Sequence, residues 1–199
     1  HEMVFRARPP KQWHKPRIGM LFQSAALFDS LTVGENVAFG LRRLGGYSEK
    51  DIREITLEKL SIVGLSGEEV IDKMPAELSG GMKKRVGLAR AIAIEPEIIL
   101  YDEPTTGLDP IMANLINQLI RHLQKTLQVT SLVVTHDLNS AKMVGDQLAL
   151  LYNAEILELN SCENFLASEN RIVQQFLKGE TEGQIIAGAG GGFYNANDL

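Results

Sequence analysis

Hydrophobic residues along the chain fall into two patterns, short continuous runs and stripes with helical spacing. Ile18–Phe22 is a short apolar run that predicts a strand. Ile98–Tyr101 and Ser131–Val134 lack polar alternation, which is typical of strands buried on both faces of a parallel sheet. Helical spacing predicts further elements at 32–44, 48–62, 80–94, 110–127, 138–144 and 163–177.

Local signals fix several element ends. Thr32 with Glu35, and Ser48 with Asp51, place a capping residue and an acid where a helix begins. Glu95-Pro96 ends the third helix, since the residue before proline avoids helical backbone. Asn153-Ala154 predicts the turn of a hairpin between 147–152 and 155–159. Along 110–127 we expect one buried stripe, formed by Ile111, Leu115, Leu119, Leu123 and Leu127.

Alternating strands and helices predict an α/β domain with a mostly parallel sheet over residues 18–178. Residues 32–95 have no strand among their helices, so we expect a helical subdomain there. We expect disorder in the basic leader, residues 1–17, and in the Gly- and Ala-rich tail, residues 179–199.

Composition narrows the classes of function. The chain is 44% hydrophobic and 23% charged with a net charge of −5, so it lacks the basic footprint of a nucleic-acid-binding protein. Cys162 is the single cysteine, which excludes a disulfide within the chain and favours a reducing compartment. No apolar run reaches the roughly 18 residues of a membrane span. Any role at a membrane is therefore expected to act through a partner.

The stretch Leu78-Ser79-Gly80-Gly81-Met82 begins the third helix. Two glycines allow close approach of backbone to a phosphate, and free N–H groups with the helix dipole favour an anion there. The Ser79 hydroxyl adds a donor. A plain turn with a serine cap explains the same residues without a ligand.

Two acids, Asp102 and Glu103, end the run 98–101, at the strand end where ligands of open α/β sheets bind. Asp102 is placed to hold Mg²⁺ through water, and Glu103 to orient or deprotonate an attacking water. Asp109 precedes Pro110 and also suits a helix cap. His136 follows one of the other two strands and could donate to a phosphate oxygen. Gln23 follows the remaining strand, and its amide could contact both a metal-bound water and a moving subdomain. Each of these two residues also has an ordinary structural explanation.

The five features occur in one order, and together they resemble the ATPase subunit of ABC transporters from about Ile18 to Leu159. The resemblance implies a P-loop NTPase-like fold and the cofactors ATP and Mg²⁺. It implies a Q-loop at Gln23, a signature at Leu78–Met82, the end of Walker B at Asp102 and a catalytic base at Glu103. It also implies a D-loop at Asp109 and a switch histidine at His136. Finally, the resemblance implies a second ATPase subunit as partner, in a head-to-tail dimer.

The stretch from Phe22 to Val33, with LSGGMKKR at 78–85, is similar to ATPases of lipid-transporting ABC systems that work with MCE-domain proteins. These include bacterial phospholipid systems and the plastid lipid importer. The similarity implies a permease partner near Leu27 and Phe28. It also implies a peripheral location on the cytoplasmic face of a membrane, or on the stromal face of the plastid inner envelope.

The phosphate-binding pattern GxxxxGK[ST] does not occur in the sequence. We therefore expect a fragment without the first strands and the P-loop, inactive alone, in which Asp102 and Glu103 face an incomplete site. Two alternatives remain, a soluble ABC ATPase outside transport and a non-catalytic regulatory subunit that offers only its signature face.

Overall fold

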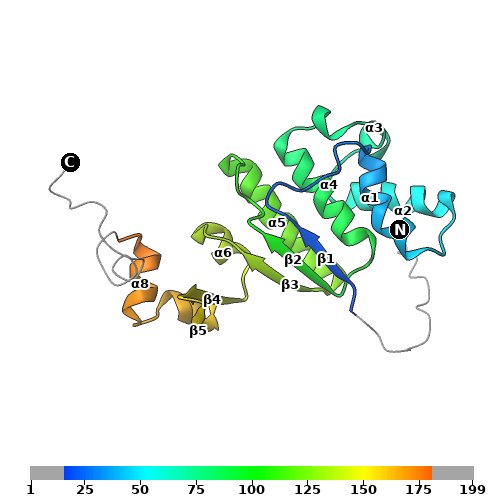
Figure 1. Cartoon of the computed structure of the whole chain (residues 1–199). Coiled ribbons are helices and arrows are strands. Elements are labelled where there is room, and N and C mark those ends of the chain that lie inside the picture. Colours follow the sequence, from blue (N-terminus) through cyan, green and yellow to red (C-terminus); the bar gives the residue numbers. More distant parts are fainter. Residues whose placement is uncertain (1–15, 181–199) are drawn as a thin grey trace. The chain divides into compact units, whose positions relative to one another are not determined.

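Three of the predicted strands form one parallel sheet in the computed structural model, which describes residues 16–180 (Figure 1). The strands are β1 (Ile18–Leu21), β2 (Ile98–Asp102) and β3 (Thr130–Val134), in the order β1-β2-β3. Leu21 pairs with Tyr101, and Asp102 pairs with Val134. The predicted parallel sheet is confirmed, and the C-terminal ends of all three strands meet at one edge.

The two faces of this sheet differ in burial. Leu21, Ile99 and Tyr101 are fully buried on one face. On the other face Leu132 and Val134 remain 59% and 58% exposed. The expectation that β3 is buried on both faces is wrong, because within residues 16–134 helices cover only one side of the strand.

Helix α4 (Gly80–Ala93) packs closely on β1 and runs antiparallel to it. A side chain at Gly19 would collide with Ala91, and one at Gly87 would press on Leu21 and Ala25. The early turns of α4 therefore lie at the C-terminal edge of the sheet, and its later turns lie beside the N-terminal half of β1.

Helices α1 (Val33–Leu44) and α2 (Glu49–Ile62) pack against α4 and against each other. Both begin with the predicted capping boxes, Thr32 with Glu35 and Ser48 with Asp51. A short α3 (Gly67–Val70) and a 3-10 turn (Pro75–Glu77) lead back to α4. Residues 33–93 thus form helices joined by short loops, and the chain then returns to the sheet at β2.

Helix α5 (Pro110–Leu127) has the predicted bounds, but the predicted buried stripe is wrong. Ile111 is 81% exposed and Leu115 is also exposed, whereas Ile116, Ile120 and Leu123 are buried. A helix has 3.6 residues per turn, so each step of four drifts by about 40°, and five residues joined by four such steps cannot stay on one face. The buried stripe instead mixes steps of four and three.

The chain divides into two compact units between Val134 and Thr135. The second unit contains α6 (Leu138–Val144), then β4 (Gln147–Tyr152) and β5 (Glu155–Ser161), which form the predicted hairpin. Asn153 and Ala154 both have positive φ, 51° and 64°, as a tight hairpin turn requires. Leu148, Leu150, Phe165 and Val173 form the core of this unit.

The single helix predicted over 163–177 is wrong. The structure has two helices, α7 (Cys162–Leu166) and α8 (Arg171–Lys178). Between them Asn170 caps α8 by accepting from the Ile172 amide, and Ser168 donates to Glu158 on β5. These polar contacts stabilise a break where apolar spacing alone suggested continuity.

No helix within residues 16–180 is both long and apolar enough to cross a membrane. The predictions for the leader and the tail fall mainly on residues 1–15 and 181–199, which lie outside the described residues.

The corrected stripe on α5 can be tested with one substitution at two sites. We expect Ile120→Ala to lower the free energy of unfolding by about 2–5 kcal/mol, because it opens a cavity beneath the helix. Ile111→Ala, on the same helix but exposed, is expected to change it by less than about 0.5 kcal/mol. Urea unfolding followed by circular dichroism measures both, and equal losses would restore the original stripe.

Candidate functional site

Asp102 and Glu103 lie at the C-terminal end of β2, the middle strand of the sheet. Glu103 has a left-handed backbone with φ 45°, and its amide donates to the Val134 carbonyl at 2.9 Å. Its carboxylate accepts from the Thr106 hydroxyl at 3.1 Å. The sheet edge therefore holds Glu103 by its backbone on one side and by its side chain on the other.

Gln23 follows β1, which neighbours β2, so its backbone and the two acids lie at the same edge. The side chain of Gln23 is exposed, whereas Asp102 and Glu103 are half-buried. An amide oxygen and a carboxylate on adjacent strand ends are hard oxygen donors of the kind that Mg²⁺ prefers.

Lys84 joins these two strand ends, and the sequence analysis assigned it no role. Its ammonium donates to the Gln23 carbonyl at 2.5 Å and to the Glu103 carbonyl at 3.1 Å. Burial lowers the pKa of Lys84, and the carboxylates of Asp102 and Glu103 act in the opposite direction. The spacing Gly81, Lys84, Leu88, Ala91 was the available signal, since it puts this lysine on the buried stripe of α4.

The signature residues form the start of α4. Ser79 is the N-cap, and its hydroxyl accepts from the Met82 amide at 3.3 Å. Ser79 and Gly80 are exposed and Gly81 is buried. No acidic residue occupies the first turn, so the positive end of the helix dipole is uncompensated by its own side chains.

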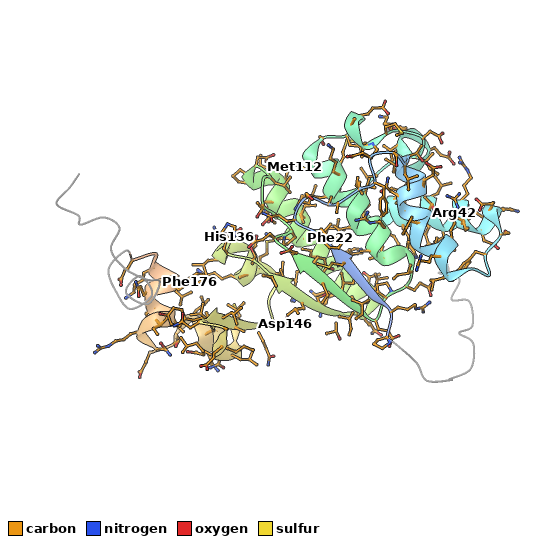
Figure 2. The ribbon with its side chains drawn as sticks, in the orientation of Figure 1. Phe22, Arg42, Met112, His136, Asp146 and Phe176 are labelled. Carbon is orange, nitrogen blue, oxygen red and sulfur yellow. The ribbon has the colours of Figure 1, made fainter. Side chains whose placement is uncertain are left out.

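A second helix start lies beside the first. Gly80 faces Leu108, and Met112, labelled in Figure 2, fills the space that a side chain at Gly81 would need. Asp109 caps α5, and its Oδ1 accepts from the amides of Ile111 and Met112 at 3.0 Å each. The capping explanation of Asp109 is correct, and it leaves the second carboxylate oxygen available for another contact.

His136 lies in the second unit and is exposed (Figure 2). It precedes Asp137, which caps α6 through the amides of Asn139 and Ser140. The hydrogen bond from the Ser140 hydroxyl, with the helix amides and the nearby His136, holds the pKa of Asp137 below its usual range. The contacts of the first unit therefore bring together Gln23, Lys84, Asp102 and Glu103, whereas His136 belongs to the second unit.

Within residues 16–180 no group of three or more His, Cys, Asp or Glu side chains is arranged to hold a metal ion. Mg²⁺ needs no such cage, because it is commonly bound by one or two protein oxygens together with phosphate oxygens and water. Asp102 and Gln23 fit that mode, in which the phosphate ligands come from a nucleotide.

The segment after Gln23 is hydrogen-bonded to the side chains of Arg90 and Asn36, and it exposes apolar side chains. Arg90 donates to the carbonyls of Ala25 and Ala26, both with positive φ. The buried Asn36 bonds to the backbone of Phe28, and the Phe28 ring lies 4.7 Å from that of Phe39. Phe28 and Phe39 are nevertheless exposed, and Leu27 is half-buried. This pattern suits burial against a partner.

The chain is similar to known proteins along most of its length. The family model of ABC transporters matches residues 3–106. The intermembrane phospholipid transport system ATP-binding protein MlaF of Escherichia coli is 38% identical over 93% of this chain and 68% of its own length. The TRIGALACTOSYLDIACYLGLYCEROL 3 protein of Arabidopsis thaliana is 45% identical over 85% of this chain and 53% of its own.

A further relative carries a different name. The probable ribonucleotide transport ATP-binding protein mkl of Mycobacterium tuberculosis is 44% identical over 84% of this chain and 46% of its own length. The chain thus spans only about half the length of several curated relatives that it matches.

Among solved structures, the dimeric post-hydrolysis ATP-binding cassette MJ0796, bound to ADP and Pi, superposes with a TM-score of 0.66. Its sequence is 36% identical, and the match covers 74% of this chain and 63% of the MJ0796 chain. The parallel sheet, the ordered motifs and these matches agree, and the chain belongs to the family of ABC transporter ATPases, with their P-loop NTPase-like fold.

Proposed function

We propose that the complete protein containing this chain is the ATP-hydrolysing subunit of an ABC transporter that moves phospholipids. The observation that carries the ATPase part is the placement of Asp102 and Glu103 at the end of the middle strand, beside the end of β1 that carries Gln23. Carboxylates at that edge are the groups that phosphoryl transfer to water requires.

In this proposal Glu103 orients the attacking water and accepts its proton. Its anchors, the Val134 carbonyl and the Thr106 hydroxyl, limit the directions in which the carboxylate can point. Asp102 and Gln23 hold Mg²⁺, whose charge stabilises that of the phosphates. His136 donates to a phosphate oxygen from the loop after β3.

Ser79, Gly80 and Gly81 present N–H groups and a hydroxyl to the phosphates of ATP held by a second subunit. The exposed start of α4 and its uncompensated dipole support this role. Asp109, next to the signature, contacts the same interface. A head-to-tail dimer gives each nucleotide a signature from one subunit and a phosphate-binding loop from the other, and the dimeric structure of MJ0796 is compatible with such an assembly.

Phospholipid is the proposed cargo because the MlaF name states it and the Arabidopsis relative bears the name of a glycolipid. We also propose a permease partner that contacts Leu27 and Phe28, because Phe28 is exposed and Leu27 only half-buried after Gln23. The resemblance to lipid-transporting ABC systems adds an MCE-domain partner and a peripheral location on the cytoplasmic face of a membrane. The chloroplastic name of the Arabidopsis relative supports the stromal face of a plastid membrane as the alternative. The name of mkl favours ribonucleotide as a second candidate cargo.

Cargo can be decided with the complete protein purified together with its permease. Stimulation of ATP turnover by phospholipid, and none by ribonucleotides, is expected. Stimulation by ribonucleotides alone would replace the phospholipid proposal.

Nucleotide binding by the isolated 199 residues is expected to be weak, because they contain no GxxxxGK[ST]. Calorimetric titration with ATP and Mg²⁺ measures it. Tight binding with turnover would show that another segment of the chain supplies the phosphate cradle.

Replacement of the proposed base tests the reaction. In the complete protein Glu103→Gln is expected to reduce ATP turnover by about 100-fold or more, because the amide cannot accept the proton, while ATP still binds. Glu95→Gln is the matched control, since Glu95 also has positive φ and lies before the opposite end of β2. Turnover retained in Glu103→Gln would remove Glu103 from this role.

The two roles of Asp109 can be separated by two substitutions. Asp109→Ala is expected to lower the free energy of unfolding by about 1 kcal/mol through loss of the cap, whereas Asp109→Asn retains the capping oxygen and much of the stability. Any loss of ATP turnover in Asp109→Asn then reports on the interface and not on folding. Equal stabilities of the two variants would show that the cap contributes little.

A further inference from the structure

Lys84 is one of two lysines that are buried within residues 16–180, and the two ammonium groups have different kinds of partner. Lys59 is 8% exposed and pairs with the carboxylate of Glu58 at 2.8 Å. Lys84 is 4% exposed, and its ammonium donates to two backbone carbonyls from distant parts of the chain, those of Gln23 and Glu103.

The reach of Lys84 depends on the close packing of α4. Gly87, one turn later on the same face, lets the helix approach Leu21 and Ala25. That approach puts the start of α4 next to the strand ends, so that one side chain spans from the helix to both β1 and β2. A bulkier residue at 87 would push the helix away from these carbonyls.

The two carbonyls belong to residues whose backbone conformations are specialised. Glu103 has positive φ, and its amide and its carbonyl are both hydrogen-bonded, to the Val134 carbonyl and the Lys84 ammonium. Gln23 starts a turn in which the Ala25 amide donates to the Phe22 carbonyl at 2.9 Å. The Lys84 ammonium therefore holds the backbone of Gln23 and of Glu103 in place. The fixed backbone in turn limits the directions of these two side chains at the sheet edge.

Packing alone does not call for a lysine here. Burying an ammonium is costly, and an apolar side chain of similar volume often serves stability as well or better. Burial lowers the pKa of Lys84, and the nearby carboxylates of Asp102 and Glu103 act in the opposite direction without cancelling this effect, so the cation lies beside the acidic edge at a cost.

We propose that Lys84 is a positioning residue, which ties the signature-bearing helix to the carbonyls of Gln23 and Glu103. A shift of α4, caused by a nucleotide that binds Ser79–Gly81 in one site of a dimer, is thereby transmitted to the metal-binding and catalytic side chains of the other site. The consequence of this inference for catalysis rests on the proposed ATPase function. The Lys84 clamp, which is the pair of hydrogen bonds from the Lys84 ammonium to the carbonyls of Gln23 and Glu103, is independent of that function.

The test compares three variants of the complete protein. Lys84→Met removes the ammonium and keeps the apolar stem, and is expected to lower kcat by about 10- to 100-fold, as small misplacements of catalytic groups do. KM for ATP is expected to stay within about twofold, because nucleotide contacts are not removed. Lys84→Arg, which keeps the charge and enough donors for both carbonyls, is expected to restore most of kcat. Lys59→Met, the same change at the other buried lysine, is expected to leave kcat unchanged.

Hydrogen exchange of the 199-residue chain provides a second readout that does not need ATP. In Lys84→Met the amides of Ala25 and Glu103 are expected to exchange faster, while those of the β2 core and of α2 keep their rates. Lys59→Met is expected to leave both amides unchanged. These two amides are hydrogen-bonded in the structure, so loosening of either strand end is directly visible.

The outcomes separate the clamp from the proposed function. If the unmodified complete protein does not hydrolyse ATP, the proposed function fails, and exchange at Ala25 and Glu103 still decides the clamp. Unchanged exchange at both amides overturns the clamp. Full turnover in Lys84→Met overturns the positioning role. The role is also overturned if the loss of turnover merely follows the amount of folded protein and Lys84→Arg does not recover it.

Discussion

The close approach of α4 to β1 is the constraint on which the rest of the first unit depends. Gly19 and Gly87 remove the side chains that would hold helix and strand apart. At this short separation α4 lies antiparallel to β1, so its N-terminus reaches the sheet edge that carries the strand-end acids. The signature residues at the start of α4 and the carboxylates at the end of β2 thus share one edge although about twenty residues separate them in sequence.

Local chemistry made much of the fold predictable. Helices α1 and α2 begin at the predicted caps because a capping box satisfies backbone groups with side chains only three residues away. The hairpin turn at Asn153-Ala154 is local in the same sense. The predictions that proved wrong concern features that depend on tertiary contacts. Residues 163–177 break into two helices because Ser168 bonds to a strand ten residues earlier, and apolar spacing carries no trace of that contact.

The candidate site divides in a similar way. Asp102, Glu103 and Gln23 were predictable in position because they follow apolar runs, and parallel strands end at a common edge. Lys84 was not assigned, because a lysine after a signature motif is ordinarily read as a solvated residue. Only the packing of α4 shows that this one points inward, although its spacing from Gly81 and Leu88 was visible in the sequence. The buried face of α5 was likewise decided by what it packs against and not by its apolar content.

The exposed face of the sheet links stability to chemistry. Asp102 alternates with Leu100 and Ile98 on β2 and pairs with Val134, so the proposed metal ligand shares its face with the exposed Leu132 and Val134. Parallel strands are normally covered by helices on both faces, and phosphoryl transfer to water needs a cradle for phosphate at the same edge. A strand followed by a phosphate-binding loop and a helix, laid beside β3, would cover the apolar residues and place the loop next to Asp102. One such segment would therefore meet both requirements, because a helix laid over Leu132 and Val134 would begin at its phosphate-binding loop.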